Sequence, residues 1–107
     1  MEEKLPFEKE ERKVVVRKEA STNPDWGCKP EERSVEQLIR FGIINLNKQS
    51  GPSSHMVADY VQKILNIKIS GHSGTLDPKV VGVLPIALDD ATRIVQALLP
   101  AGKEYIA

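Results

Sequence analysis

Residues 71–85 read GHSGTLDPKVVGVLP, and they place one aspartate, Asp77, in a glycine-rich turn between two apolar stretches. Glycine allows the backbone to turn sharply and to approach a ligand closely. Because Pro78 follows it, Asp77 is biased away from helical dihedral angles and toward an extended conformation. We therefore expect a carboxylate on a stiff loop, at the chemical centre of the chain.

The residues alone leave two interpretations of Asp77 open. An Asp-Pro pair often marks a turn in which the carboxylate hydrogen-bonds to its own backbone. A carboxylate is also ionised at neutral pH, so it can attack an electrophilic carbon without a neighbouring base. That second role needs a cationic partner, and no arginine lies beside Asp77 in the sequence. The whole 15-residue stretch favours the catalytic interpretation.

Three helices are expected around this loop, because short polar residues precede apolar residues at helical spacing. The expected caps are Ser34 in a capping box with Gln37, then Ser53 or Ser54, then Asp89 or Asp90. The first helix ends at Gly42. The apolar faces of the second and third helices comprise Met56, Val57, Tyr60, Val61, Ile64 and Leu65, and Ala91, Ile94, Val95, Leu98 and Leu99.

Short strands are expected between these helices, at residues 43–46, 67–69 and 81–88, with a further strand beginning at 104–107. Pro85 interrupts the third of these, which favours a bend or a position at a sheet edge. Helices and strands alternate, so the fold class is α/β or α+β. We expect a mixed β-sheet with flanking helices.

The first 33 residues form a charged arm, because 17 of them are charged and too few apolar residues remain for a core. Residues 13–17 could form a short edge strand, and Asn23-Pro24 and Lys29-Pro30 predict turns. We therefore divide the chain into this arm, residues 1–33, and a folded part, residues 34–107. A core of that size is only marginally stable by itself.

The charges balance, with 15 basic and 15 acidic residues, so the chain as a whole attracts neither nucleic acid nor an anionic membrane. Any RNA binding must arise from a local patch or from partners. The single cysteine, Cys28, excludes an internal disulfide and a multi-cysteine metal site. We expect a reducing, cytoplasmic setting, no metal, and no membrane span, since no apolar run approaches about 18 residues.

Other candidate site residues have both plain and functional interpretations. His72 could orient or stack on a base, or satisfy backbone groups in the loop, whereas His55 near a helix start is expected to be structural. Lys48, Gly51 and Ser54 form a turn into a helix start, which could bind an anion or be a plain capped loop. Tyr105 could stack on a base or belong to the core.

Three motifs together resemble the TruB/dyskerin family of pseudouridine synthases, which isomerise uridine in RNA. They are NKQSGPSSH at residues 47–55, GHSGTLDP at 71–78 with Gly82, Leu84, Pro85, Ala91 and Thr92, and GKEY at 102–105. Their order and spacing also fit. The segment ASTNPDWG at residues 20–27 is similar to the archaeal, guide-RNA-dependent branch of the family.

The resemblance implies a role for each site residue. Asp77 corresponds to the catalytic aspartate, which attacks the ribose or the uracil ring or otherwise assists glycosidic cleavage. Tyr105 corresponds to a tyrosine that packs on the flipped base, and His72 to a histidine associated with base extrusion. Substrate contacts are implied for Gly74, Thr75 and Leu76, and support of the catalytic loop for Lys48 and Gly51.

The resemblance also implies no cofactor, a tRNA or rRNA substrate, a box H/ACA guide RNA and small accessory ribonucleoproteins. It covers about the first third of a family member, an incomplete catalytic domain. The family's later arginine partner of the aspartate and its C-terminal RNA-binding domain have no counterpart among these residues. We therefore expect no activity from the 107 residues alone, and the alternative is a non-catalytic RNA-binding or assembly module.

Overall fold

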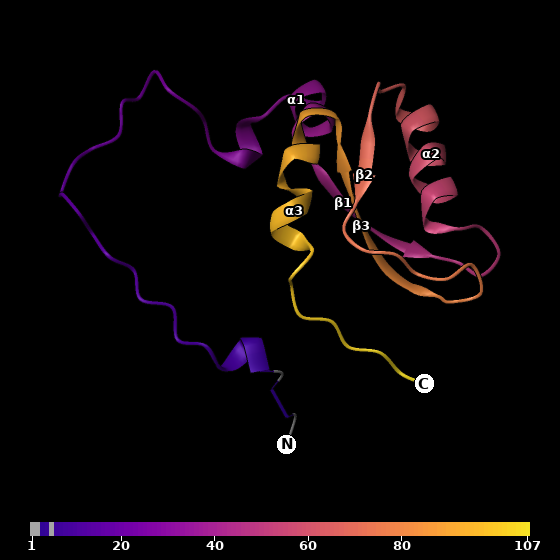
Figure 1. Cartoon of the computed structure of the whole chain (residues 1–107). Coiled ribbons are helices and arrows are strands. Elements are labelled where there is room, and N and C mark those ends of the chain that lie inside the picture. Colours follow the sequence, from indigo (N-terminus) through magenta and orange to yellow (C-terminus); the bar gives the residue numbers. More distant parts are fainter. Residues whose placement is uncertain (1–2, 5) are drawn as a thin grey trace.

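The computed structural model describes residues 3–4 and 6–107, and it combines a small antiparallel sheet with short helices (Figure 1). Two 3-10 helices, η1 and η2, lie in the N-terminal arm. The elements are η1 (Pro6–Lys9), η2 (Pro30–Glu32), α1 (Val35–Arg40), β1 (Ile43–Lys48), α2 (Ser54–Leu65), β2 (Ser70–His72), β3 (Gly82–Leu88), η3 (Asp89–Ile94) and α3 (Val95–Leu98).

The sheet has the strand order β1-β3-β2, and both pairings are antiparallel. Ile43 pairs with Ala87 at one end of the β1–β3 ladder, and Lys48 pairs with Gly82 at the other. The α+β class and the flanking helices are confirmed. The parallel part of the expected mixed sheet is not formed by the described strands.

The core lies between α2 and one face of the sheet. Val57 and Val61 of α2 pack with Leu84, Ile86 and Leu88 of β3, all of them buried. The three β3 residues alternate along the strand, so they share one face. The loop that carries Asp77 precedes β3 and is joined to this core by Leu76.

The apolar face expected for α2 is wider than the face that the structure buries. Met56 and Tyr60 are about half exposed, and Ile64 is 80% exposed. These three residues recur every fourth position, so they form a line beside the buried stripe. The core therefore buries only part of the apolar face expected for α2.

The second face of the sheet is covered only in part. Gly71 on β2 lies opposite Ala87, and a β-carbon at Gly71 would contact Val95 at 3.4 Å. Thus η3 and α3 close this end of the sheet, on the side away from α2 (Figure 1). Val83, toward the other end of β3, remains exposed, and so does Ile43 on the outer strand β1.

Two strand predictions need correction. The strand expected at residues 67–69 begins only at Ser70, because Asn66 ends α2 in a left-handed conformation (φ 52°) and Ile67 turns back onto the core. Pro85 does not mark an edge, since β3 is the central strand. The β2 ladder ends at His72 opposite Ile86, so Pro85 lies just beyond it.

The expected caps hold for two helices and fail for the third. Ser34 and Gln37 form the capping box of α1, and Ser53 caps α2 by accepting from the Met56 amide at 3.2 Å. No side chain caps η3. Asp90 instead accepts a 2.7 Å bond from Arg40 of α1, a tertiary contact that local sequence does not reveal.

The arm and the C-terminal residues contain no strand in the part of the chain that the structure describes. The valines of residues 14–16 are exposed, and residues 104–107 are irregular. Both predicted strands are therefore wrong, since a strand needs a neighbour to pair with. The turn at Asn23-Pro24 is confirmed by the bond from the Trp26 amide to the Asn23 carbonyl, 3.1 Å.

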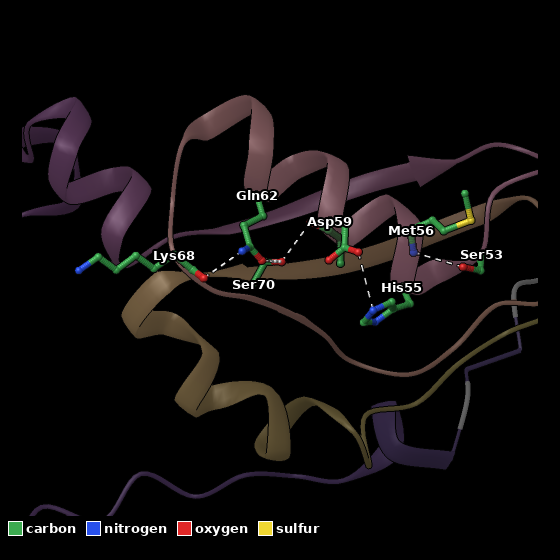
Figure 2. A network of polar contacts seen from close by, with 8 residues as sticks. Ser53, His55, Met56, Asp59, Gln62, Lys68 and Ser70 are labelled. Carbon is green, nitrogen blue, oxygen red and sulfur yellow. Dashed lines mark hydrogen bonds and ion pairs between the residues drawn. The ribbon is translucent and has the colours of Figure 1, made fainter.

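Polar contacts join α2 to β2 (Figure 2). The Ser70 hydroxyl lies 3.0 Å from the Ala58 carbonyl and 3.3 Å from Gln62 Oε1, and the Gln62 amide donates to the Lys68 carbonyl. His55 is far out on the helix surface, 3.8 Å from Asp59 and 81% exposed. The structural role expected for His55 stays a prediction.

Lys48, the last residue of β1, ties the loop before β3 to the sheet. Its side chain is 0% exposed, and its ammonium group donates to the carbonyls of Gln49, Pro78 and Val80 at 2.7–3.0 Å. An ammonium has three donors, and all three are used. Burying the charge is tolerable only because it is fully hydrogen-bonded.

We predict that Lys48→Met lowers the free energy of unfolding by about 3 kcal/mol, because it removes three hydrogen bonds and leaves the carbonyls of Gln49 and Val80 without the lysine donor. Chemical denaturation of the complete polypeptide that carries this region measures the change. Lys63→Met alters an exposed lysine on α2 and should stay within about 0.5 kcal/mol of the parent. Equal effects of the two substitutions would contradict a structural role of the Lys48 contacts.

Candidate active site

Asp77 lies on the loop between β2 and β3, and backbone contacts hold the loop on both sides of it. On the preceding side, Ser54 hydrogen-bonds to Leu76: its hydroxyl donates to the Leu76 carbonyl at 3.0 Å and accepts from the Leu76 amide at 2.9 Å. Leu76 also packs its side chain against the core. The residue before Asp77 is therefore fixed through both its backbone and its side chain.

On the following side, the Pro78 carbonyl accepts two bonds, from the Lys48 ammonium at 3.0 Å and from the Gly51 amide at 2.8 Å. The Val80 amide donates to the carbonyl of Asp77 at 2.9 Å, which closes a tight turn. The Asp77 side chain remains exposed. The backbone on both sides of Asp77 is thus fixed, while its carboxylate is exposed to solvent.

The turn before α2 is not built to bind an anion through Lys48. The ammonium group points into the protein and is saturated by carbonyls. Gly51 has φ 120°, a conformation that favours glycine, and its amide is used by Pro78. The anion-binding interpretation of this turn is therefore wrong as far as Lys48 and Gly51 are concerned, and both contact the Asp77 loop instead.

His72, at the end of β2, contacts the loop that follows it. Its Nδ1 hydrogen-bonds to the Gly74 carbonyl, so this nitrogen carries the proton, since a carbonyl can only accept. Gly74 has φ 99°, which disfavours any side chain. This contact satisfies a backbone group, as the plain interpretation of His72 requires, and leaves Nε2 available for other partners.

A cavity of about 820 Å³ opens on the second face of the sheet, beside the Asp77 loop. Its wall contains three of the predicted site residues of the loop, Gly74, Thr75 and Leu76, together with Tyr105. Asp77 and His72 are not part of the wall. The apolar floor and sides include Ile43, Val81, Val83, Leu84, Pro85, Leu98 and Ile106.

Tyr105 reaches this cavity from the irregular segment after α3, and its side chain is 65% exposed. Lys103, two residues earlier, caps the end of α3 by donating to the carbonyls of Leu99 and Ala101 at 2.9 and 3.1 Å. A β-carbon at Gly74 would lie 3.5 Å from the Lys103 side chain. The C-terminal segment therefore lies against the Asp77 loop.

The Asp77 carboxylate has no ion pair with any residue that the structure describes, where the ion pairs found are Arg40–Asp90 and His55–Asp59. The same residues contain no group of three or more His, Cys, Asp or Glu side chains suited to a metal. None of the described helices is both long enough and apolar enough to cross a membrane.

Ser54 is the site residue that sequence reasoning missed. The local sequence predicts only a helix cap or part of an anion-binding turn at Ser54, yet its hydroxyl contacts Leu76, 22 residues away. The motif does indicate a second role, because Ser53 and Ser54 are adjacent and only one serine can occupy the cap position. The second was free for another role.

Two protein families match the chain. Residues 2–58 match the DKCLD (NUC011) domain, and residues 62–107 match the N-terminal domain of the TruB family pseudouridylate synthases. The first match runs across the expected boundary between residues 33 and 34, so that boundary stays a prediction.

Archaeal proteins described as "Probable tRNA pseudouridine synthase B" are similar in sequence. The chain is 62% identical to that of Pyrococcus furiosus and 64% identical to that of Thermococcus kodakarensis, each over 90% of this chain. It is 53% identical to that of Methanopyrus kandleri over 96% of this chain. The chain spans 28, 29 and 30% of the length of these relatives, respectively.

Solved structures agree with these relationships. The chain matches an H/ACA RNP bound to a substrate RNA containing 2′-deoxyuridine with a TM-score of 0.81 and 58% identity, over 87% of this chain and 30% of that one. A Cbf5-Nop10-Gar1 complex matches with a TM-score of 0.73 and 63% identity, over 77% and 25%. The chain belongs to the TruB/dyskerin family of pseudouridine synthases and corresponds to the N-terminal portion of its archaeal members.

Proposed function

We propose that the complete polypeptide carrying this region isomerises specific uridines in RNA to pseudouridine, with Asp77 as the catalytic aspartate. The observation that carries the proposal is the exposed carboxylate on a backbone held from both sides, by Ser54 at Leu76 and by Lys48 and Gly51 at Pro78. Such preorganisation lets a nucleophile meet its target without reorganising. The family match gives the reaction class.

The chemistry follows from the position of Asp77. Its ionised carboxylate attacks the ribose or the uracil ring, or otherwise assists cleavage of the glycosidic bond. The detached base then rotates and is rejoined to the ribose through carbon. The carboxylate is regenerated when the product forms, so the reaction consumes no cofactor. A cation from outside the described residues completes the site, because Asp77 has no ion pair among them.

The cavity beside the loop supports the binding of a single flipped base. An enzyme that acts on a nucleotide base must first take it out of its stack. Tyr105 supplies an exposed aromatic face on the cavity wall, and Gly74, Thr75 and Leu76 line the side nearest Asp77. His72 is the last residue before the loop. Its Nδ1 bonds to Gly74, and its other ring nitrogen, Nε2, stays available to assist extrusion of the base.

We infer that the substrate is tRNA or rRNA and that a box H/ACA guide RNA and small accessory proteins take part, in the cytoplasm. Relatives described as tRNA pseudouridine synthases and a neighbour in complex with Nop10 and Gar1 support this assignment. The balanced charge of the chain also supports it, because the chain offers no strong attraction to RNA of its own.

An assembly module without catalysis is the second candidate, and one observation favours it. The described residues lack a cation for Asp77 and leave one face of the sheet partly open. The two candidates differ in a simple respect. A module needs RNA binding but no intact carboxylate at position 77, whereas an enzyme needs both.

We predict that Asp77→Asn lowers the rate of pseudouridine formation by about 10³-fold or more, since the amide cannot act as the nucleophile. The assay uses the complete polypeptide assembled with guide RNA and accessory proteins, under single-turnover conditions. Asp25→Asn, at an exposed position in the arm, is the matched control and should keep the parent rate. Full activity of the Asp77 variant would disprove its catalytic role.

Tyr105→Leu should reduce kcat/KM by about 10- to 100-fold, because stacking of a base on an aromatic ring contributes about 1–3 kcal/mol. Tyr105→Phe keeps the ring and should retain most of the activity. Tyr60→Leu removes a half-exposed tyrosine from α2 and serves as the control. If Tyr105→Leu and Tyr60→Leu behave alike, Tyr105 does not contact the base.

A further inference from the structure

Two adjacent serines at the start of α2 have different partners. Ser53 is the helix cap, and its hydroxyl accepts from the Met56 amide within the same helix (Figure 2). Ser54, one residue on, makes no capping bond. Its hydroxyl is bonded to Leu76 in the loop that carries Asp77. Ser53 therefore stabilises its own helix, whereas Ser54 joins the helix to a distant loop.

The contact between Ser54 and Leu76 is buried and two-sided. Ser54 is 0% exposed, and its hydroxyl both donates to the Leu76 carbonyl and accepts from the Leu76 amide. The amide belongs to the peptide group between Thr75 and Leu76, and the carbonyl to the peptide group between Leu76 and Asp77. One hydroxyl thus holds both peptide planes on either side of Leu76.

The second of these peptide planes contains the backbone nitrogen of Asp77. Its orientation sets the first dihedral angle of Asp77, and through it the direction of the carboxylate. On the other side the Asp77 backbone is limited by Pro78, whose carbonyl is fixed by Lys48 and Gly51. Without the Ser54 contact, the peptide plane before Asp77 has no hydrogen-bond partner among the described residues and is free to rotate.

We propose that Ser54 is a positioning residue that aims the Asp77 carboxylate through the Leu76 backbone. The proposal rests on the catalytic role of Asp77 given above. Ser54 does not line the cavity, so it acts on the reaction step and not on RNA binding. A displacement of about 1 Å in a reacting group can reduce a rate by about 10²-fold.

Hydrogen exchange tests the contact without any assay of activity. In the complete polypeptide, Ser54→Ala should raise the exchange rate of the peptide covering residues 73–80 at least several-fold, because the Leu76 amide loses its acceptor. Ser53→Ala should raise exchange only at the start of α2, where the Met56 amide is freed. Unchanged exchange at residues 73–80 in Ser54→Ala would overturn the contact.

Single-turnover kinetics tests the positioning role. Ser54→Ala should slow isomerisation by about 10- to 100-fold at saturating RNA while the affinity for RNA stays within about twofold, as expected for misalignment of one reacting group. Ser54→Cys keeps a side chain of the same shape but with a larger atom that is a weaker donor and acceptor, and its rate should fall between those of Ser54→Ala and the parent. Ser53→Ala should retain the parent rate.

The outcomes separate this proposal from the one on which it rests. Raised exchange at residues 73–80 with an unchanged rate in both Ser54 variants would overturn the positioning role but leave Asp77 catalytic. Full activity of Asp77→Asn would overturn the catalytic role while the exchange result still stood. If Ser54→Ala does not fold, the Ser54→Cys variant decides, and a parent-like rate together with raised loop exchange would count against positioning.

Discussion

The structure around Asp77 depends on a buried ammonium group that faces only carbonyl oxygens. Lys48 ends β1 and donates to Gln49, Pro78 and Val80, and two of these acceptors lie 30 or more residues away. Since an unpaired buried charge is very costly, the loop must keep its carbonyls in place for the strand to keep its lysine. The strand and the Asp77 loop therefore order each other.

Around this contact the molecule is asymmetric. Helix α2 packs against one face of the sheet, and Ser54 of this helix hydrogen-bonds to Leu76 in the Asp77 loop. The other face is only partly covered by η3 and α3, and the cavity that Tyr105 lines lies there. A packed face gives the loop its rigidity, while the open face leaves room for a ligand.

Local sequence was a good guide wherever a structure depends on neighbouring residues. The capping box at Ser34, the cap at Ser53 and the central apolar run of β3 were all predicted, because each involves residues within a few positions of one another. The predicted cap at Asp89 or Asp90 was wrong, since both residues lie within η3 and Asp90 pairs with Arg40, 50 residues away. The terminal strands were wrong because no neighbouring strand is present among the described residues.

The sequence by itself determined the family, the order of most elements and the turn at Asp77, because glycine and proline restrict the backbone locally and the motifs are specific. Only the tertiary structure decided that Lys48 points inward and that Ser54 holds Leu76. These roles arise from contacts 22 to 32 residues apart that local preferences do not encode. Lysine and serine at a turn look solvent-facing until the fold buries them.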